Sequence, residues 1–226
     1  MSCVSPLPAV FLDRDGVINH SLVSNGKPLA PRCLEDFQLF DDVPQALSRL
    51  KDLGFLLIVA TNQPDVGNGL VERDIVEKMN RILLNDLPID AVKVCYHAQT
   101  AGCHCRKPKP GLLTEAAHEL NVDLSNSFMI GDRWSDVGAG RSAGCRTIFI
   151  DRGYSEPRPS DQDFDATSLE VAVKLIAARA PAKTTDEGGT DMAPAFPTMP
   201  GSRNKCCRKF PIARSVSRCS PTTCRQ

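Results

Sequence analysis

The chain of 226 residues has no long apolar run, no internal repeat and no excess of charge of either sign. No apolar run approaches the ~20 residues that a bilayer-spanning helix needs, which argues against an integral membrane protein. The first ten residues, MSCVSPLPAV, contain neither a basic stretch nor a long apolar stretch. We therefore expect no secretion signal, no membrane partner and a cytoplasmic location.

The zero net charge conceals an uneven distribution. Residues 181–226 contain eight Lys/Arg and three Asp/Glu, which leaves 19 Lys/Arg and 24 Asp/Glu in the first 180 residues. An acidic body of this kind argues against a nucleic-acid partner. Residues 181–226 also contain six prolines and no periodic apolar pattern. We expect one domain over residues 1–180, a disordered basic tail with four cysteines over 181–226, and a monomer.

The domain alternates short apolar runs with helical patterns, which is typical of βαβ units and a parallel sheet covered on both faces. The sequence thus predicts a Rossmann-like α/β fold. Strands are predicted at 9–12, 55–60, 92–96, 127–130 and 146–150, and helices at 43–53, 71–85, 110–120, 135–143 and 168–179.

Asp13 and Asp15 directly follow the first predicted strand and are themselves followed by Gly16. Two carboxylates this close repel each other unless a cation or a proton lies between them. Mg²⁺, which prefers oxygen ligands, suits such a pair. Ligands of open α/β sheets bind beyond the carboxyl ends of the strands, where these two residues are expected to lie.

Further polar residues follow the other predicted strands and are expected at the same edge of the sheet. They are Thr61-Asn62-Gln63, Arg106-Lys107-Pro108 and Gly131-Asp132-Arg133. These residue types suit phosphoryl transfer, with Asp13 as nucleophile and Asp15 as acid and base. Thr61 and Lys107 would hold the phosphoryl group, and Asp132 would complete the Mg²⁺ site. Asp136 is expected to lie behind that site.

Cysteines are plentiful, with ten in the chain. They do not suggest a disulfide framework, because no export signal is expected. Cys95, His97, Cys103 and Cys105 instead supply three thiolates and an imidazole at a spacing that fits a closed tetrahedral Zn²⁺ site. Such a site leaves no position for a catalytic water. Its expected role is to order the loop that leads to Arg106 and Lys107.

The segments FLDRDGV, ATNQ, CRKPKPG and GDRWSD, in this order, resemble the four motifs of haloacid dehalogenase superfamily phosphatases. This resemblance implies that Asp13 is the nucleophile, that Asp15 is the acid and base, and that the main-chain carbonyl of Asp15 binds Mg²⁺. The short segments between the motifs leave little room for a cap domain, so a capless core is expected.

The Cys/His cluster resembles the zinc-containing branch of that superfamily. This branch includes D-glycero-D-manno-heptose 1,7-bisphosphate phosphatases and the histidinol-phosphatase domain. The resemblance implies substrate contacts from Arg106 and Arg133, and we expect another from Asn62. The 7-phosphate of the heptose bisphosphate is the predicted substrate group. The short segment between His97 and Cys103 favours histidinol phosphate as an alternative. A catalytically silent binding protein on the same fold is a third possibility.

Overall fold

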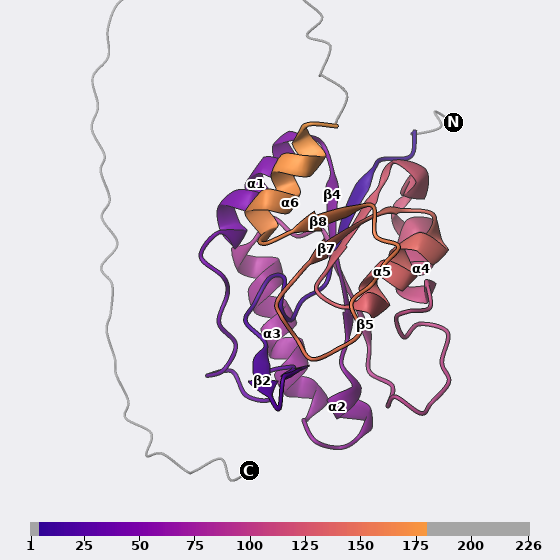
Figure 1. The fold of residues 1–226 in the computed structure, drawn as a ribbon. Helices are drawn as coiled ribbons and strands as arrows, with labels where there is room; N and C mark the ends of the chain where they lie inside the picture. Colours follow the sequence, from indigo (N-terminus) through magenta and orange to yellow (C-terminus); the bar gives the residue numbers. More distant parts are fainter. Residues whose placement is uncertain (1–4, 180–226) are drawn as a thin grey trace, which may run out of the picture. The chain divides into compact units, whose positions relative to one another are not determined.

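The computed structural model describes residues 5–179, so the predicted tail over 181–226 lies outside the described residues. The larger strands and helices follow the predicted pattern closely (Figure 1). The strands of the main sheet are β1 (Ala9–Leu12), β4 (Leu56–Asn62), β5 (Ala91–Cys95), β6 (Phe128–Gly131), β7 (Arg146–Ile150) and β8 (Phe164–Ala166). The helices are α1 (Val43–Asp52), α2 (Pro64–Gly67), α3 (Arg73–Asp86), α4 (Gly111–Leu120), α5 (Trp134–Ala143) and α6 (Leu169–Ala177), and a 3₁₀ turn spans Leu124–Asn126.

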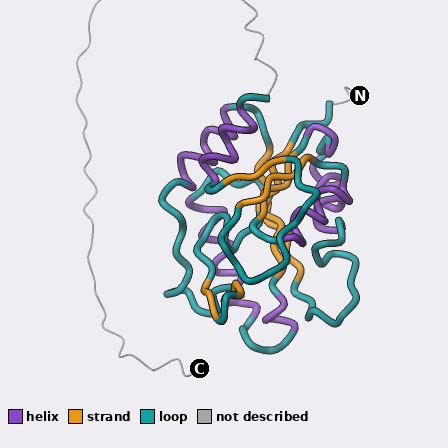
Figure 2. The backbone as a smooth tube through the Cα atoms, in the orientation of Figure 1, coloured by secondary structure: helices purple, strands orange, loops and turns teal. Residues whose placement is uncertain are grey.

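The main sheet has the order β5-β4-β1-β6-β7-β8, and every strand pair in it is parallel. The strand order turns at β1, because β4 and β5 lie on one side of it and β6, β7 and β8 lie on the other. Long loops gather at the lower end of the sheet in Figure 2, where the strands end. Parallel sheets of this kind bind ligands at such a switch point.

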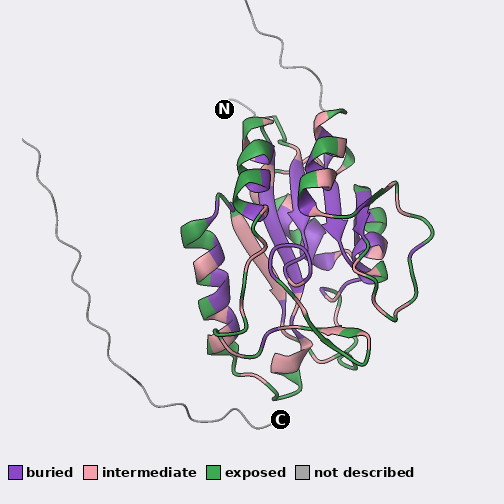
Figure 3. Ribbon diagram, turned by 60° about the vertical axis from the view of Figure 1, so that its left-hand side comes forward, coloured by how far each residue is buried: buried purple, intermediate pink, exposed green. Residues whose placement is uncertain are grey.

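Helices cover both faces of the sheet, and the side chains of β1 alternate between them. Val10 and Leu12 pack into the cluster that includes α1 and α6, whereas Ala9 and Phe11 pack into the cluster that includes α4 and α5. The buried strands run between helices whose outer faces are exposed (Figure 3). A strand buried on both sides needs apolar residues at every position, which explains the unbroken AVFL run before Asp13.

Three short strands, one short helix and the 3₁₀ turn were not predicted. Strand β8 pairs with the edge of the sheet, and β2 (Leu22–Ser24) and β3 (Lys27–Leu29) form a separate antiparallel hairpin. Helix α2 has only four residues. Each is too short to show a clear apolar period. In the described part of the chain, only this hairpin forms a second sheet, which agrees with a capless core. No helix within residues 5–179 is long and apolar enough to cross a membrane.

Candidate active site

Asp13 lies at the carboxyl end of β1 and is 7% exposed. Its backbone N–H donates to the carbonyl of Ile130 on β6 at 2.9 Å, which extends the pairing beyond the strand. Its Oδ1 accepts from the Arg14 backbone N–H at 2.8 Å and lies 2.9 Å from the Lys107 ammonium. The other oxygen, Oδ2, has no hydrogen-bond partner among the described residues.

Lys107 is 2% exposed, and its Nζ lies between two carboxylates, 2.9 Å from Asp13 and 2.6 Å from Asp136. Burial alone would lower the pKa of Lys107, but the two carboxylates outweigh that effect and raise it. Asn62 holds the backbone of Lys107 from both sides. Its amide donates to the Lys107 carbonyl at 3.1 Å, and its Oδ1 accepts from the Lys107 N–H at 3.1 Å. The ammonium is therefore both charged and fixed in position.

Three buried carboxylates meet beside this ammonium. Asp13, Asp132 and Asp136 can each offer an oxygen to a common point, with these oxygens within 4.8 Å of one another. Burial, then the charge of Asp136, raises the pKa of Asp13 to about 6. Burial, then the charge of Asp13, raises the pKa of Asp132 well above its ordinary value. The cluster thus strongly disfavours a full set of negative charges in the absence of a cation.

The donor set of this cluster suits a divalent cation. Both carboxylate oxygens of Asp132 are buried without a hydrogen-bond partner of normal geometry. Three carboxylates and one ammonium also leave two negative charges to be balanced. Mg²⁺ takes oxygen ligands and carries two positive charges, so the residues fit it. Asp136 is closer to this point than predicted, since its carboxylate belongs to the cluster and pairs with Lys107.

Gly16 makes room for Asp132. A Cβ at this position would lie 1.7 Å from Asp132 Oδ2 and 2.9 Å from the Tyr154 hydroxyl. Its φ of +89° also lies in the left-handed region that glycine adopts without strain. Any side chain here would force the Asp132 carboxylate to move. Gly16 thus allows the FLDRDGV and GDRWSD segments to lie close to each other.

Asp15 points toward a different set of groups. Its two oxygens accept from the Arg14 guanidinium at 3.1 Å each, from Asn19 Nδ2 at 2.9 Å and from Gln63 Nε2 at 2.7 Å. Arg14 is fully buried and also donates to Asn80 on α3 at 3.2 Å. The Asp15 carboxylate is outside the three-carboxylate cluster, although it lines the same cleft as Asp13.

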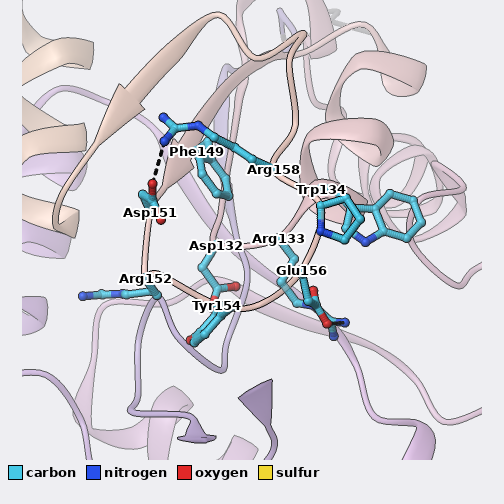
Figure 4. A pocket seen from close by; sticks show the side chains of 10 residues that line it. Asp132, Arg133, Trp134, Phe149, Asp151, Arg152, Tyr154, Glu156 and Arg158 are labelled. Atoms are coloured by element: carbon cyan, nitrogen blue, oxygen red, sulfur yellow. Dashed lines mark hydrogen bonds and ion pairs between the residues drawn. The ribbon is translucent and has the colours of Figure 1, made fainter. Parts of the chain in front are cut away.

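The cleft above the cluster is open to solvent and has a volume of ≈ 330 Å³. Asn62, Arg106 and Arg133 line it, together with Asp13, Asp15 and Lys107. Thr61 is 1% exposed and is not among the described residues that line the cleft. Its hydroxyl oxygen accepts from Gln63 Nε2 at 2.9 Å. Arg106 has a buried Nη1 without a partner, whereas the Arg133 guanidinium is paired with Glu156 (Figure 4).

The four predicted Zn²⁺ ligands also converge, at the end of β5 and in the loop that follows it. Their ligand atoms lie within 4.8 Å of one another. The Cys95–Cys103 and Cys103–Cys105 sulfur atoms are 3.6 and 3.5 Å apart, and His97 Nδ1 lies 3.6 and 3.3 Å from the sulfurs of Cys95 and Cys105. A tetrahedral Zn²⁺ would require sulfur–sulfur separations of about 3.7 Å, so the residues fit it.

Burial and the neighbouring thiols raise the pKa of Cys105 to about 12, and burial also raises the pKa of Cys95. A Zn²⁺ ion would reverse this preference, because it binds the thiolate form. His104 lies between two ligands in the sequence but points elsewhere. Its Nε2 lies 2.5 Å from Glu115, and its side chain is 78% exposed. The imidazole of the cluster is therefore that of His97.

Comparisons with known proteins decide the family. The HAD-hydrolase-like family model matches residues 104–175. A D-glycero-β-D-manno-heptose-1,7-bisphosphate 7-phosphatase from Pasteurella multocida is 36% identical over 184 residues, covering 74% of this chain and 96% of the relative. The chain belongs to the heptose-1,7-bisphosphate 7-phosphatase family of HAD-like hydrolases. The α-anomer enzyme of Photorhabdus laumondii is 29% identical and covers 75% of this chain and 97% of its own length.

A solved structure supports the fold of this heptose-bisphosphate phosphatase family member. The D,D-heptose 1,7-bisphosphate phosphatase from B. bronchiseptica, crystallised with magnesium and phosphate, has a TM-score of 0.67 and 24% sequence identity. The similarity covers 77% of this chain and all of the other chain. The superfamily that the four motifs resemble, the heptose-bisphosphate phosphatase branch that the Cys/His cluster resembles, and the predicted α/β core are thus confirmed.

Several residues of this family member's site were given no role by sequence reasoning, although Gln63 was expected at this edge of the sheet. Arg14, Asn19 and Gln63 all hold Asp15, and Tyr154 and Glu156 approach the cluster from the loop after β7. Arg14, Asn19 and Gln63 lie within or beside the sequence motifs, so their positions in the sequence could have identified them as site residues. Tyr154 and Glu156 belong to no motif, and only the folding of the chain brings them near Asp132 and Arg133.

Proposed function

We propose that this protein hydrolyses a sugar phosphate monoester, namely the 7-phosphate of D-glycero-D-manno-heptose 1,7-bisphosphate. The observation that carries this proposal is the buried cluster of Asp13, Asp132 and Asp136 with Lys107 at the floor of an open cleft. Membership of the heptose-bisphosphate phosphatase family supports the choice of substrate. The open cleft, without a cap domain over the described core, suits a substrate with two phosphate groups.

In the first step, Asp13 attacks the phosphorus atom. Lys107 and the Arg14 N–H engage Oδ1, which leaves Oδ2 to form the new bond to phosphorus. The bond between phosphorus and the sugar oxygen breaks, and the leaving oxygen takes a proton from the Asp15 carboxyl group. The products of this step are the sugar with a free 7-hydroxyl group, which keeps its 1-phosphate, and an aspartyl phosphate on Asp13.

In the second step, a water molecule attacks the same phosphorus from the cleft. Asp15, now a carboxylate, accepts a proton from this water. The oxygen of the water bonds to phosphorus, and the bond to Asp13 breaks, which releases inorganic phosphate. Lys107, with Thr61 beneath the cleft, stabilises the charge on the phosphoryl oxygens in both steps. Arg106, Arg133 and Asn62 contact the remainder of the substrate.

Two metal ions complete this proposal. Mg²⁺, held by the carboxylates of Asp13 and Asp132 and the carbonyl of Asp15, would offset the repulsion between the nucleophile and the phosphate. Zn²⁺, held by Cys95, His97, Cys103 and Cys105, would order the loop that carries Arg106 and Lys107. Mg²⁺ prefers the oxygen ligands of the first site, whereas Zn²⁺ prefers the sulfur and nitrogen ligands of the second, so the ligand types direct each ion to its own site.

The test is a release assay for inorganic phosphate with heptose 1,7-bisphosphate and histidinol phosphate on one preparation. We expect turnover of the heptose substrate, and both anomers should be supplied because relatives of both kinds are known. Asp13→Asn should lower kcat by at least about 10³-fold. Asp41→Asn, at an exposed aspartate outside the cleft, is the matched control. If only histidinol phosphate is turned over, the alternative substrate is the correct one. If neither compound is turned over, the protein is better explained as a catalytically silent binding protein.

A further inference from the structure

The loop after β7 holds the catalytic edge of the sheet at two points. Arg152 Nε donates to the carbonyl of Gly16 at 2.8 Å, and the Ser155 N–H donates to the carbonyl of Gly26 at 2.7 Å. The first contact reaches the loop of the proposed nucleophile, and the second reaches the turn of the β2–β3 hairpin. Glu156 directly follows Ser155, so its backbone is fixed next to the second of these contacts.

Glu156 makes a bidentate ion pair with Arg133. Arg133 Nε lies 2.8 Å from one carboxylate oxygen, and Nη2 lies 2.6 Å from the other. The Glu156 side chain is 16% exposed and that of Arg133 is 37% exposed. Both residues line the cleft that contains Asp13, Asp15 and Lys107, and Figure 4 shows their side chains next to each other. A forked geometry of this kind fixes the plane of the guanidinium as well as its distance.

One edge of the guanidinium remains available. Glu156 occupies the edge formed by Nε and Nη2, and Nη1 has no hydrogen-bond partner among the described residues. An arginine has five N–H donors, so at least two of them are left for a ligand. The backbone of Arg133 is also fixed, because its N–H donates to Asp136 Oδ2 at 3.0 Å.

We propose that Glu156 is a positioning residue that determines specificity. It holds Arg133 with its free edge ready for the part of the substrate that is not hydrolysed, namely the sugar hydroxyls and the second phosphate. This inference rests on the proposed function and adds a residue from outside the four motifs. Without Glu156, the long Arg133 side chain would have to lose its freedom each time a substrate binds, which weakens binding.

This proposal predicts an effect of unexpected sign. Glu156 places negative charge beside a cleft for an anionic substrate, so on charge alone its removal should tighten binding. If Glu156 instead positions Arg133, its removal should weaken substrate binding. Glu156→Gln keeps the size of the side chain but replaces one acceptor oxygen with a donor, which breaks the bidentate pair.

The test compares heptose 1,7-bisphosphate with p-nitrophenyl phosphate, which has no sugar and no second phosphate. We expect Glu156→Gln to raise KM for the bisphosphate about tenfold, with kcat changed by less than about threefold. The loss of kcat/KM should be several-fold smaller for p-nitrophenyl phosphate. In an Arg133→Ala background, Glu156→Gln should have no further effect, because the two residues act as one unit.

Glu170→Gln is the matched control, since Glu170 also makes an ion pair but is exposed on α6. Thermal unfolding of each variant reports whether the fold is intact. An unchanged or lower KM for the bisphosphate, equal losses on both substrates, or independent effects of the two substitutions would overturn the proposal. If the wild-type protein does not turn over the bisphosphate, the proposed function fails, and this outcome is separate from a failure of the Glu156 assignment.

Discussion

The protonation of individual residues at this site depends on how their charges are balanced in a buried environment. Asp13, Asp132 and Asp136 share one ammonium, that of Lys107. Water cannot solvate these groups well, because each is less than 10% exposed. Asp13 and Asp132 therefore hold protons more strongly than exposed carboxylates do. This tendency has consequences for stability as well as for catalysis.

Protein prepared in Mg²⁺-free buffer should become less stable as pH rises from about 4 to above 6. The pKa of Asp13 is about 6 in the folded chain, against 3.8 for an ordinary aspartate, chiefly because of burial and then the charge of Asp136. The folded state thus binds more protons than the unfolded state in this range. The contribution of Asp13 is fully present below about pH 4 and is lost as pH rises through about 6.

Asp13→Asn isolates this effect, because it removes the titrating group and leaves the Zn²⁺ ligands in both proteins. Denaturant unfolding at pH 4.5 and pH 7.5 gives the stability of each. We expect the wild-type stability, relative to the variant, to fall by about 1–3 kcal/mol between these values. A constant difference, or a rise, would show that burial does not perturb Asp13 in this way.

Gly16→Ala should damage activity more than stability. The added Cβ would lie 1.7 Å from Asp132 Oδ2, so the carboxylate must move. A displacement of this order can cost about 100-fold in kcat/KM. Gly54→Ala is the control, because Gly54 has a similar φ of +91° but no atom within 4 Å of the added Cβ. Equal activity losses in the two variants would mean that backbone strain, rather than the clash with Asp132, is responsible.

At the scale of elements, the sheet brings the site together. Residues from the ends of β1, β4 and β6 meet because parallel strands all end at one edge. The apolar runs predicted these strands within two residues, since strands buried on both faces consist mainly of apolar residues. The β2–β3 hairpin gave no such signal, because its residues are largely exposed and its strands have three residues each.

The loop of the Cys/His cluster is the element that should depend most on metal. Cys103→Ser should abolish near-stoichiometric Zn²⁺ and loosen the loop before Arg106, because three ligands hold the ion far less well than four. Elemental analysis and hydrogen exchange over residues 97–107 measure the two effects. Cys33→Ser, outside the cluster, should retain the metal. Full Zn²⁺ content in Cys103→Ser would contradict the assignment.

At the scale of the whole molecule, every residue of the proposed site lies between Asp13 and Glu156. Residues 1–182 also form one compact unit. A protein that ends at residue 182 should therefore fold and match the kcat/KM of the full chain within about twofold, since truncation keeps every residue of the proposed site. Parallel assays and thermal unfolding of the two chains check this. A large loss of activity would assign the basic segment a role in catalysis. The monomeric state and the cytoplasmic location remain predictions.

The sequence by itself indicated the candidate site residues and the order of the larger elements. Apolar runs, turn residues and motif spacing are local properties, so Asp13, Lys107, Asp132 and the Cys/His cluster could be identified before the fold was known. Only the tertiary structure shows which other residues hold these side chains in position. Asn62 forms hydrogen bonds to the backbone of Lys107, Gly16 leaves space for the Asp132 carboxylate, and Glu156 pairs with the Arg133 guanidinium. These contacts join segments far apart in the chain, and a local pattern contains no information about which distant residue will fill the space beside it.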